Sequence, residues 1–349
     1  MIDLLIFAAI LGFLILGHEF GHFVAARARR VQVTEFGIGF PPRLFTLFHF
    51  KGTRFTVNAI PLGGFVRPVG EDDPTVTGGL AGASKTTRAI VLLAGPGANI
   101  LLGILAFTVA FKFASPDPTR VMVTQIASGS PAEAAGILRG DLVLALDEIP
   151  MASFEDLRQA TADHLDIPVV LTILRAGEEI ELTLTPRSIH PEDEGPLGLT
   201  IGHPTRQASW TEAVGYGVDS VVLQVQNLAL LPSRLARGEV APQEARVSGL
   251  KGMYDMFAWA GEIDRDAQRP FLTLNLTGII SIGLAVANLL PIPALDGGRL
   301  AFVLIEATTR RRISPRYEGL AHAIGFVLLL ILMAYVNLQD FTNPIALPR

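Results

Sequence analysis

Four long runs of apolar residues dominate the pattern of hydrophobic and polar positions along this chain of 349 residues. At about 1.5 Å of rise per helical residue, each run can cross a hydrocarbon core about 30 Å thick. The pattern predicts transmembrane helices at Leu4–Ala26, Ala89–Phe111, Leu272–Ile292 and Leu320–Leu338. The first run lacks the basic segment and the small-residue cleavage site of a signal peptide, so we expect it to remain in the mature protein.

A fifth apolar run, Trp210–Leu231, is interrupted by carboxylates and amides, among them Glu212 and Asp219. Its valines, such as Val214 and Val218, recur at helical spacing, which is typical of an amphipathic helix. We therefore expect this segment to lie on the membrane surface and not to form a fifth span.

Shorter alternations of apolar and polar residues lie between the first two spans. Arg43–Phe50 and Thr53–Ile60 flank the turn dipeptide Lys51–Gly52, which predicts a β-hairpin. The pattern fits two interpretations equally well: a hairpin with a functional role, and a β-meander that contributes only to folding.

The segment 115–203 has the composition of a small soluble domain that mixes strands and helices. Its run SGSPAEAAGILRGDLVLALDEIPM resembles a PDZ domain, including the turn at Gly140 and Asp141 and the strand after it. A single copy is visible. The strands are expected at Val121–Ile126, Leu142–Leu146, Val169–Leu174 and Glu179–Leu184, and the helices at Pro131–Ala135 and Phe154–His164.

Composition and charge indicate where these segments lie. The chain is 50% hydrophobic and only 17% charged, which is too apolar for an ordinary soluble protein. Lys and Arg accumulate on the cytoplasmic side of a membrane. Residues 27–88 contain nine basic and four acidic residues, residues 310–316 contain four arginines, and residues 115–270 contain twelve basic and twenty-three acidic residues. We therefore expect a multi-pass protein of the cell (inner) membrane with a cytoplasmic hairpin and with both termini and the PDZ-like domain outside.

The expected fold class is a polytopic α-helical membrane protein with four transmembrane helices, a cytoplasmic membrane-associated β-hairpin region and an inserted extracytoplasmic PDZ (α+β) domain. The expected segments are the first transmembrane helix (1–30), the hairpin region (31–87), the second transmembrane helix (88–114), the PDZ domain (115–203), an amphipathic helical region (204–269) and the last two transmembrane helices (270–349).

The first apolar run contains the sequence HEFGH at His18–His22. Two imidazoles four residues apart lie on one face of a helix, where they can chelate a metal ion, and Glu19 beside them can take a proton from an attacking water. The chain has no cysteine, which excludes thiolate ligands and a thiolate nucleophile. Ionisable residues inside an apolar span are costly and by default functional. The alternative is a pair of structural histidines satisfied by neighbouring helices.

Two imidazoles leave a catalytic zinc site one protein ligand short. The candidate is Asp296 in NLLPIPALDGG, Asn288–Gly298, where Pro291 and Pro293 break the third span and the paired glycines let the backbone approach a neighbour closely. Both HEFGH and Asp296 precede basic segments that are expected to be cytoplasmic, so the topology places them at one membrane depth. The alternative is that Asp296 only caps the following helix, Arg299–Ala307.

With GPGAN at Gly95–Asn99 and the single PDZ-like insert, these motifs make the chain resemble the bacterial site-2 proteases, the group that includes the regulator of sigma-E protease. The resemblance covers nearly the whole chain. It implies an intramembrane zinc metalloprotease in which His18, His22 and Asp296 bind Zn²⁺ and Glu19 is the catalytic base. It implies hydrolysis of peptide bonds within or near transmembrane segments of membrane proteins, for example anti-sigma factors or signal-peptide remnants.

The resemblance also implies a substrate site at the hairpin, where an edge strand around Val57–Val66 pairs with an extended substrate. We expect Gly63, Gly64 and Phe65 of that strand to contact the substrate, and Asn288 to hold the same extended backbone. The expected partners are single-pass membrane proteins or peptides and the lipid bilayer, with no nucleic acid.

One departure from the family pattern lies before the third span, where a sequence like SGPxGI is expected and Ser248–Met253 reads SGLKGM. Two other classes of protein remain as alternatives. A membrane transporter or metal permease would use the His and Asp cluster as an ion site, although no inverted repeat is apparent. A non-catalytic scaffold would work through the PDZ-like domain and would have no need of Glu19.

Overall fold

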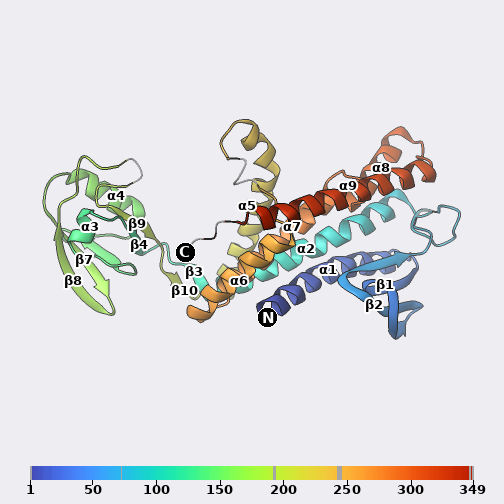
Figure 1. Cartoon of the computed structure of the whole chain (residues 1–349), viewed down its shortest axis with the longest axis horizontal. Helices are drawn as coiled ribbons and strands as arrows, with labels where there is room; N and C mark the ends of the chain where they lie inside the picture. Colours follow the sequence, from blue (N-terminus) through green and yellow to red (C-terminus); the bar gives the residue numbers. More distant parts are fainter. Residues whose placement is uncertain (1, 72, 192–193, 242–245, 346, 348–349) are drawn as a thin grey trace. The chain divides into compact units, whose positions relative to one another are not determined.

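The computed structural model describes residues 2–71, 73–191, 194–241, 246–345 and 347 (Figure 1). The chain forms two compact units, residues 1–112 with 209–349, and residues 113–208. Its helices are α1 (Ile2–Ala28), α2 (Lys85–Ala114), α3 (Pro131–Ala134), α4 (Phe154–Asp163), α5 (Trp210–Ala236), α6 (Leu250–Asp266), α7 (Phe271–Leu289), α8 (Asp296–Thr309) and α9 (Pro315–Thr342). Its strands are β1 (Val33–Phe50), β2 (Thr53–Pro68), β3 (Ser115–Pro116), β4 (Val121–Ile126), β5 (Leu142–Leu146), β6 (Ile149–Pro150), β7 (Val169–Arg175), β8 (Glu178–Leu184), β9 (Leu199–Gly202) and β10 (Thr205–Arg206).

Among the described helices, α1, α2, α7 and α9 are long and apolar enough to cross a membrane, which confirms the four expected spans. The helix α5, which contains the segment Trp210–Leu231, is not one of them. Small residues let the spans pack closely. A Cβ atom at Gly103 of α2 would lie 2.6 Å from the side chain of Ile282 on α7, so the two helices approach each other closely at this glycine.

The helix α7 ends at Leu289, three residues before the expected end of the third span at Ile292. Leu290 is extended, with φ −62° and ψ 141°. The cause is Pro291, because a proline ring disfavours the helical conformation of the residue before it. The expected break at Pro291 and Pro293 is confirmed, and only the apolar run, which continues to Ile292, extends beyond the helix.

The strands β1 and β2 form the expected antiparallel hairpin, with Lys51 and Gly52 in left-handed conformations at its turn. Both strands bend, so that residues 35–38 pair with residues 54–57, and residues 33–38 also pair with residues 64–68. On its other side, the stretch 53–58 pairs with residues 43–50. The hairpin is therefore a small sheet of four stretches.

The bending changes which stretch of the hairpin forms an edge. Val57 pairs with both Ile38 and Phe45, so it lies inside the sheet and cannot accept an additional strand. Residues 64–68 pair only with β1 among the described strands. The expected edge strand around Val57–Val66 is thus reduced to its last part.

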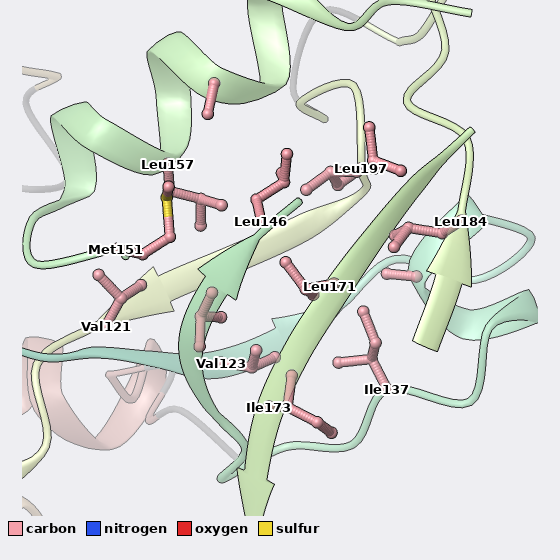
Figure 2. Packing of buried hydrophobic residues seen from close by; sticks show 14 residues of the cluster. Val121, Val123, Ile137, Leu146, Met151, Leu157, Leu171, Ile173, Leu184 and Leu197 are labelled. Carbon is pink, nitrogen blue, oxygen red and sulfur yellow. The ribbon is translucent and has the colours of Figure 1, made fainter. Parts of the chain in front are cut away.

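The unit 113–208 contains a six-stranded sheet with the strand order β8-β7-β5-β4-β9, in which β6 pairs with β5. The helices α3 and α4 begin after Ser130 and Ser153, whose hydroxyl oxygens accept backbone N–H groups of the first turn. The predicted elements of this segment agree with the structure to within one residue at each boundary. Figure 2 shows its apolar core, in which Val121, Leu146 and Leu171 are completely buried.

Candidate active site

The helix α1 carries His18, Glu19 and His22. The spacing of four residues puts both imidazoles on one face of the helix, with their ring centroids 4.8 Å apart. Their Nε2 atoms lie 3.1 Å from each other. Two nitrogen lone pairs can therefore be directed at one point beside the helix.

Asp296, the first residue of α8, completes this cluster. Its Oδ2 lies 3.1 Å from His18 Nε2 and 3.2 Å from His22 Nε2. The three potential ligand atoms all lie within 4.8 Å of one another. The residue that caps α8 is Leu295, and no side chain caps the helix. The interpretation of Asp296 as a helix cap, with a helix starting at Arg299, is therefore wrong.

Two glycines allow Asp296 to reach the histidines. A Cβ at Gly297 would lie 2.3 Å from the carbonyl oxygens of Leu289 and Leu290, and one at Gly298 would lie 2.2 Å from that of Ile292. A side chain at either position would push α8 away from the broken end of α7. The sequence LDGG thus lets a new helix start directly against the end of the previous one.

Glycine also opens the opposite wall of the site, on α2. A Cβ at Gly95 would lie 2.3 Å from His22 Nε2 and 2.8 Å from His18 Nε2. On α1, a Cβ at Gly21 would lie 2.3 Å from the carbonyl oxygen of Ala94. The two helices therefore touch at this level, and the space beside the Nε2 atoms stays open because Gly95 has no side chain.

The other ring nitrogens of the histidines face α2. His22 Nδ1 lies 2.7 Å from the carbonyl oxygen of Val91, to which it donates, so Nε2 is left as the lone-pair nitrogen. The carboxamide of Asn99, which is 1% exposed, lies 3.5 Å from His18 Nδ1. Sequence reasoning gave these partners no role, although Asn99 ends the GPGAN motif one helical turn after Gly95.

The carboxylate of Glu19 points at the hairpin. Its Oε2 accepts a hydrogen bond from the backbone N–H of Val66, at 3.0 Å. Val66 lies in the edge stretch 64–68. The candidate base is therefore in direct contact with this edge stretch of the sheet.

A cavity of about 430 Å³ surrounds the cluster. Of the predicted substrate-binding residues, Gly64, Phe65 and Asn288 line it. Gly63 is not among the lining residues; with φ +87° it is part of the bend that precedes the edge stretch.

Two charged residues of this cavity were missed from the sequence. Arg299 of α8 and Glu71 of the loop after the hairpin both line it, and they form an ion pair. Nothing in the sequence links two residues that are 228 positions apart. The available signal was the position of Arg299 directly after LDGG.

The donor set suits a metal ion. Two imidazole nitrogens and one carboxylate oxygen are ligands that a catalytic zinc ion takes in proteins, with one position left for water. The space that a Cβ at Gly95 would fill adjoins both nitrogens. His18, His22 and Asp296 are therefore the residues that would hold zinc.

Comparison with models of known protein families shows the family of this chain. A model described as Peptidase family M50 matches residues 6–332, a range that contains HEFGH, GPGAN and LDGG. The chain belongs to peptidase family M50. Membership of M50 confirms the resemblance to the site-2 proteases and does not favour a transporter.

Curated relatives align with this M50 chain almost from end to end. A provisionally named zinc metalloprotease of Rhizobium meliloti is 30% identical, over 96% of this chain and 95% of its own length. One of Clostridium acetobutylicum is 31% identical, over 96% of each chain. The metalloprotease MmpA of Caulobacter vibrioides is 28% identical, over 93% of this chain and 92% of its own.

Proposed function

We propose that this M50 protein is a zinc endopeptidase that cuts membrane proteins within or near their transmembrane segments. In this proposal His18, His22 and Asp296 bind zinc and Glu19 is the catalytic base. The observation that carries it is the convergence of three ligand atoms within 4.8 Å, beside Glu19, in a chain with four apolar helices. The names of the relatives as metalloproteases support the same activity.

When bound, zinc supplies Lewis-acid activation of a water molecule and of the scissile carbonyl group. Glu19 accepts a proton from that water as its oxygen adds to the carbonyl carbon. The resulting carboxylic acid returns the proton to the amide nitrogen as the C–N bond breaks. One product ends in a carboxylate and the other in a protonated amine, which takes up the second proton of the water, and no acyl-enzyme forms.

The hairpin edge supplies a site for an extended substrate. A transmembrane helix hides its carbonyl groups in internal hydrogen bonds, so it has to unwind before hydrolysis. Pairing with residues 64–68 would replace the lost hydrogen bonds. Gly64, Phe65 and Asn288 line the same cavity as the zinc ligands, which supports their role in holding the substrate.

The charge distribution supports a placement in the cell (inner) membrane. The basic segments 27–88 and 310–316 would be cytoplasmic, with the active site near that side, and the acidic segment 115–270 and both termini would be outside. The unit 113–208 would be an extracytoplasmic PDZ domain, as its sequence SGSPAEAAGILRGDLVLALDEIPM suggests.

The substitution Glu19→Gln tests the mechanism. It removes the base and leaves all three ligands in place, so cleavage of a model transmembrane peptide should fall by at least about 100-fold while the zinc content stays at one per chain. Glu262→Gln, at an exposed glutamate of α6, is the control and should leave both values unchanged. Normal cleavage by Glu19→Gln would exclude Glu19 as the base.

A further inference from the structure

The helix α9 has little contact with the rest of the protein. Its buried residues are Gly325 near one end and Val336 and Asp340 near the other. At the second end, Asp340 accepts hydrogen bonds from the backbone N–H groups of Gly249 and Gly252, at 2.8 and 2.9 Å, and from Arg246. This end of α9 is therefore fixed to α6 and to the segment before it.

The other end of α9 holds the segment that leads to Asp296. Nδ1 of His322 accepts a hydrogen bond from the backbone N–H of Ala294, at 2.7 Å. Ala294 has φ +82°, a conformation that is strained for a residue with a side chain and persists only where the surroundings impose it. Two residues later the chain reaches Asp296, whose carboxylate lies against both histidines.

Gly325 supports the same segment one helical turn after His322. A Cβ at Gly325 would lie 2.2 Å from the carbonyl oxygen of Pro293, so the helix and the loop are in direct backbone contact. The ring of Phe302 on α8 meets the ring of His322 edge to face, with centroids 5.6 Å apart. The segment before Asp296 is thus held by one hydrogen bond to His322 and by close packing against Gly325, and Phe302 packs against His322 from α8.

We infer that α9 positions the third zinc ligand: His322 and Gly325 hold Pro293–Ala294 in the conformation that brings the carboxylate of Asp296 to the histidines. His322 is in this view a positioning residue, which never touches zinc or substrate. The inference rests on the proposed role of Asp296. Burial supports it, because the described residues of α9 between Gly325 and Val336 are at most partly buried.

The test uses the full-length purified protein and two variants that disturb the contact in different ways. His322→Phe keeps a ring of similar size and removes the acceptor for the Ala294 N–H group. Gly325→Ala leaves His322 in place and pushes against Pro293. Both should weaken zinc binding by roughly 10- to 100-fold, the loss of affinity that follows when a group that orients a metal ligand is removed, and the weaker binding should appear as faster release of zinc to a chelator.

Two further variants act as controls. Gly319→Ala lies on the same helix, where a Cβ would have no neighbour within 4 Å, and it should release zinc at the wild-type rate. His322→Asn keeps an acceptor at nearly the position of Nδ1, so it should recover most of the zinc retention that His322→Phe loses. If Gly325→Ala does not fold, the His322 pair decides the matter.

A second measurement does not depend on zinc. Hydrogen exchange at the Ala294 amide in zinc-free protein should be faster in His322→Phe than in the wild type. Wild-type zinc release in folded His322→Phe and Gly325→Ala would overturn the inference, even if that amide exchanges faster.

The variant Asp296→Asn separates this inference from the proposed function. It should release zinc faster than any α9 variant. If Asp296→Asn retains zinc normally, the ligand assignment is wrong and the positioning role falls with it. If Asp296→Asn loses zinc while the α9 variants retain it normally, the proposed function stands and the positioning role alone is refuted.

Discussion

Gly95 determines whether the two histidines can bind one metal ion together. Its missing side chain leaves the space beside both Nε2 atoms. Alanine at this position would place a methyl group 2.3 Å from His22 Nε2, a distance that requires the ring to move. The first residue of the sequence GPGAN therefore has a steric explanation.

We expect Gly95→Ala to lower zinc content and to reduce cleavage by roughly 100-fold, because displacements of about 1 Å have effects of that size on catalytic geometry. Gly97→Ala is the matched control on the same helix, since a Cβ there has nothing within 4 Å. It should behave like the wild type or be slightly more stable. Metal analysis gives the zinc content of both variants, and a peptide assay gives their cleavage rates. Equal zinc contents and equal rates for the two variants would contradict the steric explanation.

Local spacing predicted part of the candidate site. His18, Glu19 and His22 could be grouped because one helical turn brings them together wherever the helix lies. Asp296 needed the argument that a zinc site requires a third ligand. Val91 could not be predicted, because its carbonyl group is recognised only when the packing of two helices is known.

The hairpin and the third span show how well individual elements can be predicted. The turn at Lys51–Gly52 was visible in the sequence, but the bends that give four paired stretches were not, since alternation shows which face is apolar and not where a strand turns. Gly39 and Gly63, both at positive φ, lie next to stretches that change partner. Hydropathy alone would carry the third span to Ile292, and Pro291 is the residue that indicates where α7 stops.

In the unit 113–208, Asp141 connects β5 to the turn before it and to β7. Its carboxylate accepts hydrogen bonds from Arg175, at 2.7 and 2.8 Å, and from the N–H of Leu138, at 2.7 Å. Burial by itself raises the pKa of Asp141, but the hydrogen bonds from Arg175 and Leu138 outweigh it, and the pKa is lowered from its ordinary value.

The lowered pKa gives this unit a pH-dependent stability. The ionised form is favoured in the folded state, so the stabilisation is complete above the unfolded pKa of about 3.9 and is lost as the pH falls through the folded value. We expect Asp141→Asn to cost about 2 kcal/mol at neutral pH and to flatten the loss of stability in acid. Denaturant unfolding at several pH values, monitored through hydrogen exchange of the β5 amides, measures the free energy of unfolding of this unit. Asp163→Asn, at an exposed position, is the control and should keep the wild-type pH profile. A pH profile of Asp141→Asn identical to that of the wild type would rule out the effect.

For the whole molecule, the proposed topology depends on the distribution of charge alone. The chain has no cysteine, so one introduced thiol can report the side on which a segment lies. His49→Cys in the hairpin and Arg311→Cys before α9 should be protected from an impermeant reagent in intact cells, whereas Glu178→Cys in β8 should react. Reaction of His49→Cys and protection of Glu178→Cys would invert the topology, and a difference between His49→Cys and Arg311→Cys would contradict the number of spans between them.

The distribution of contacts along α9 also bears on how the sequence can vary. Its residues 331–335 are all exposed, so within a bilayer these positions only need to be apolar. His322, Gly325 and Asp340 make backbone contacts that depend on the identity of the side chain. In a scan of all substitutions, the middle of the helix should accept exchange among leucine, isoleucine, valine and phenylalanine. The helix would then show a long tolerant segment between a few intolerant positions, a pattern that its uniform hydropathy conceals.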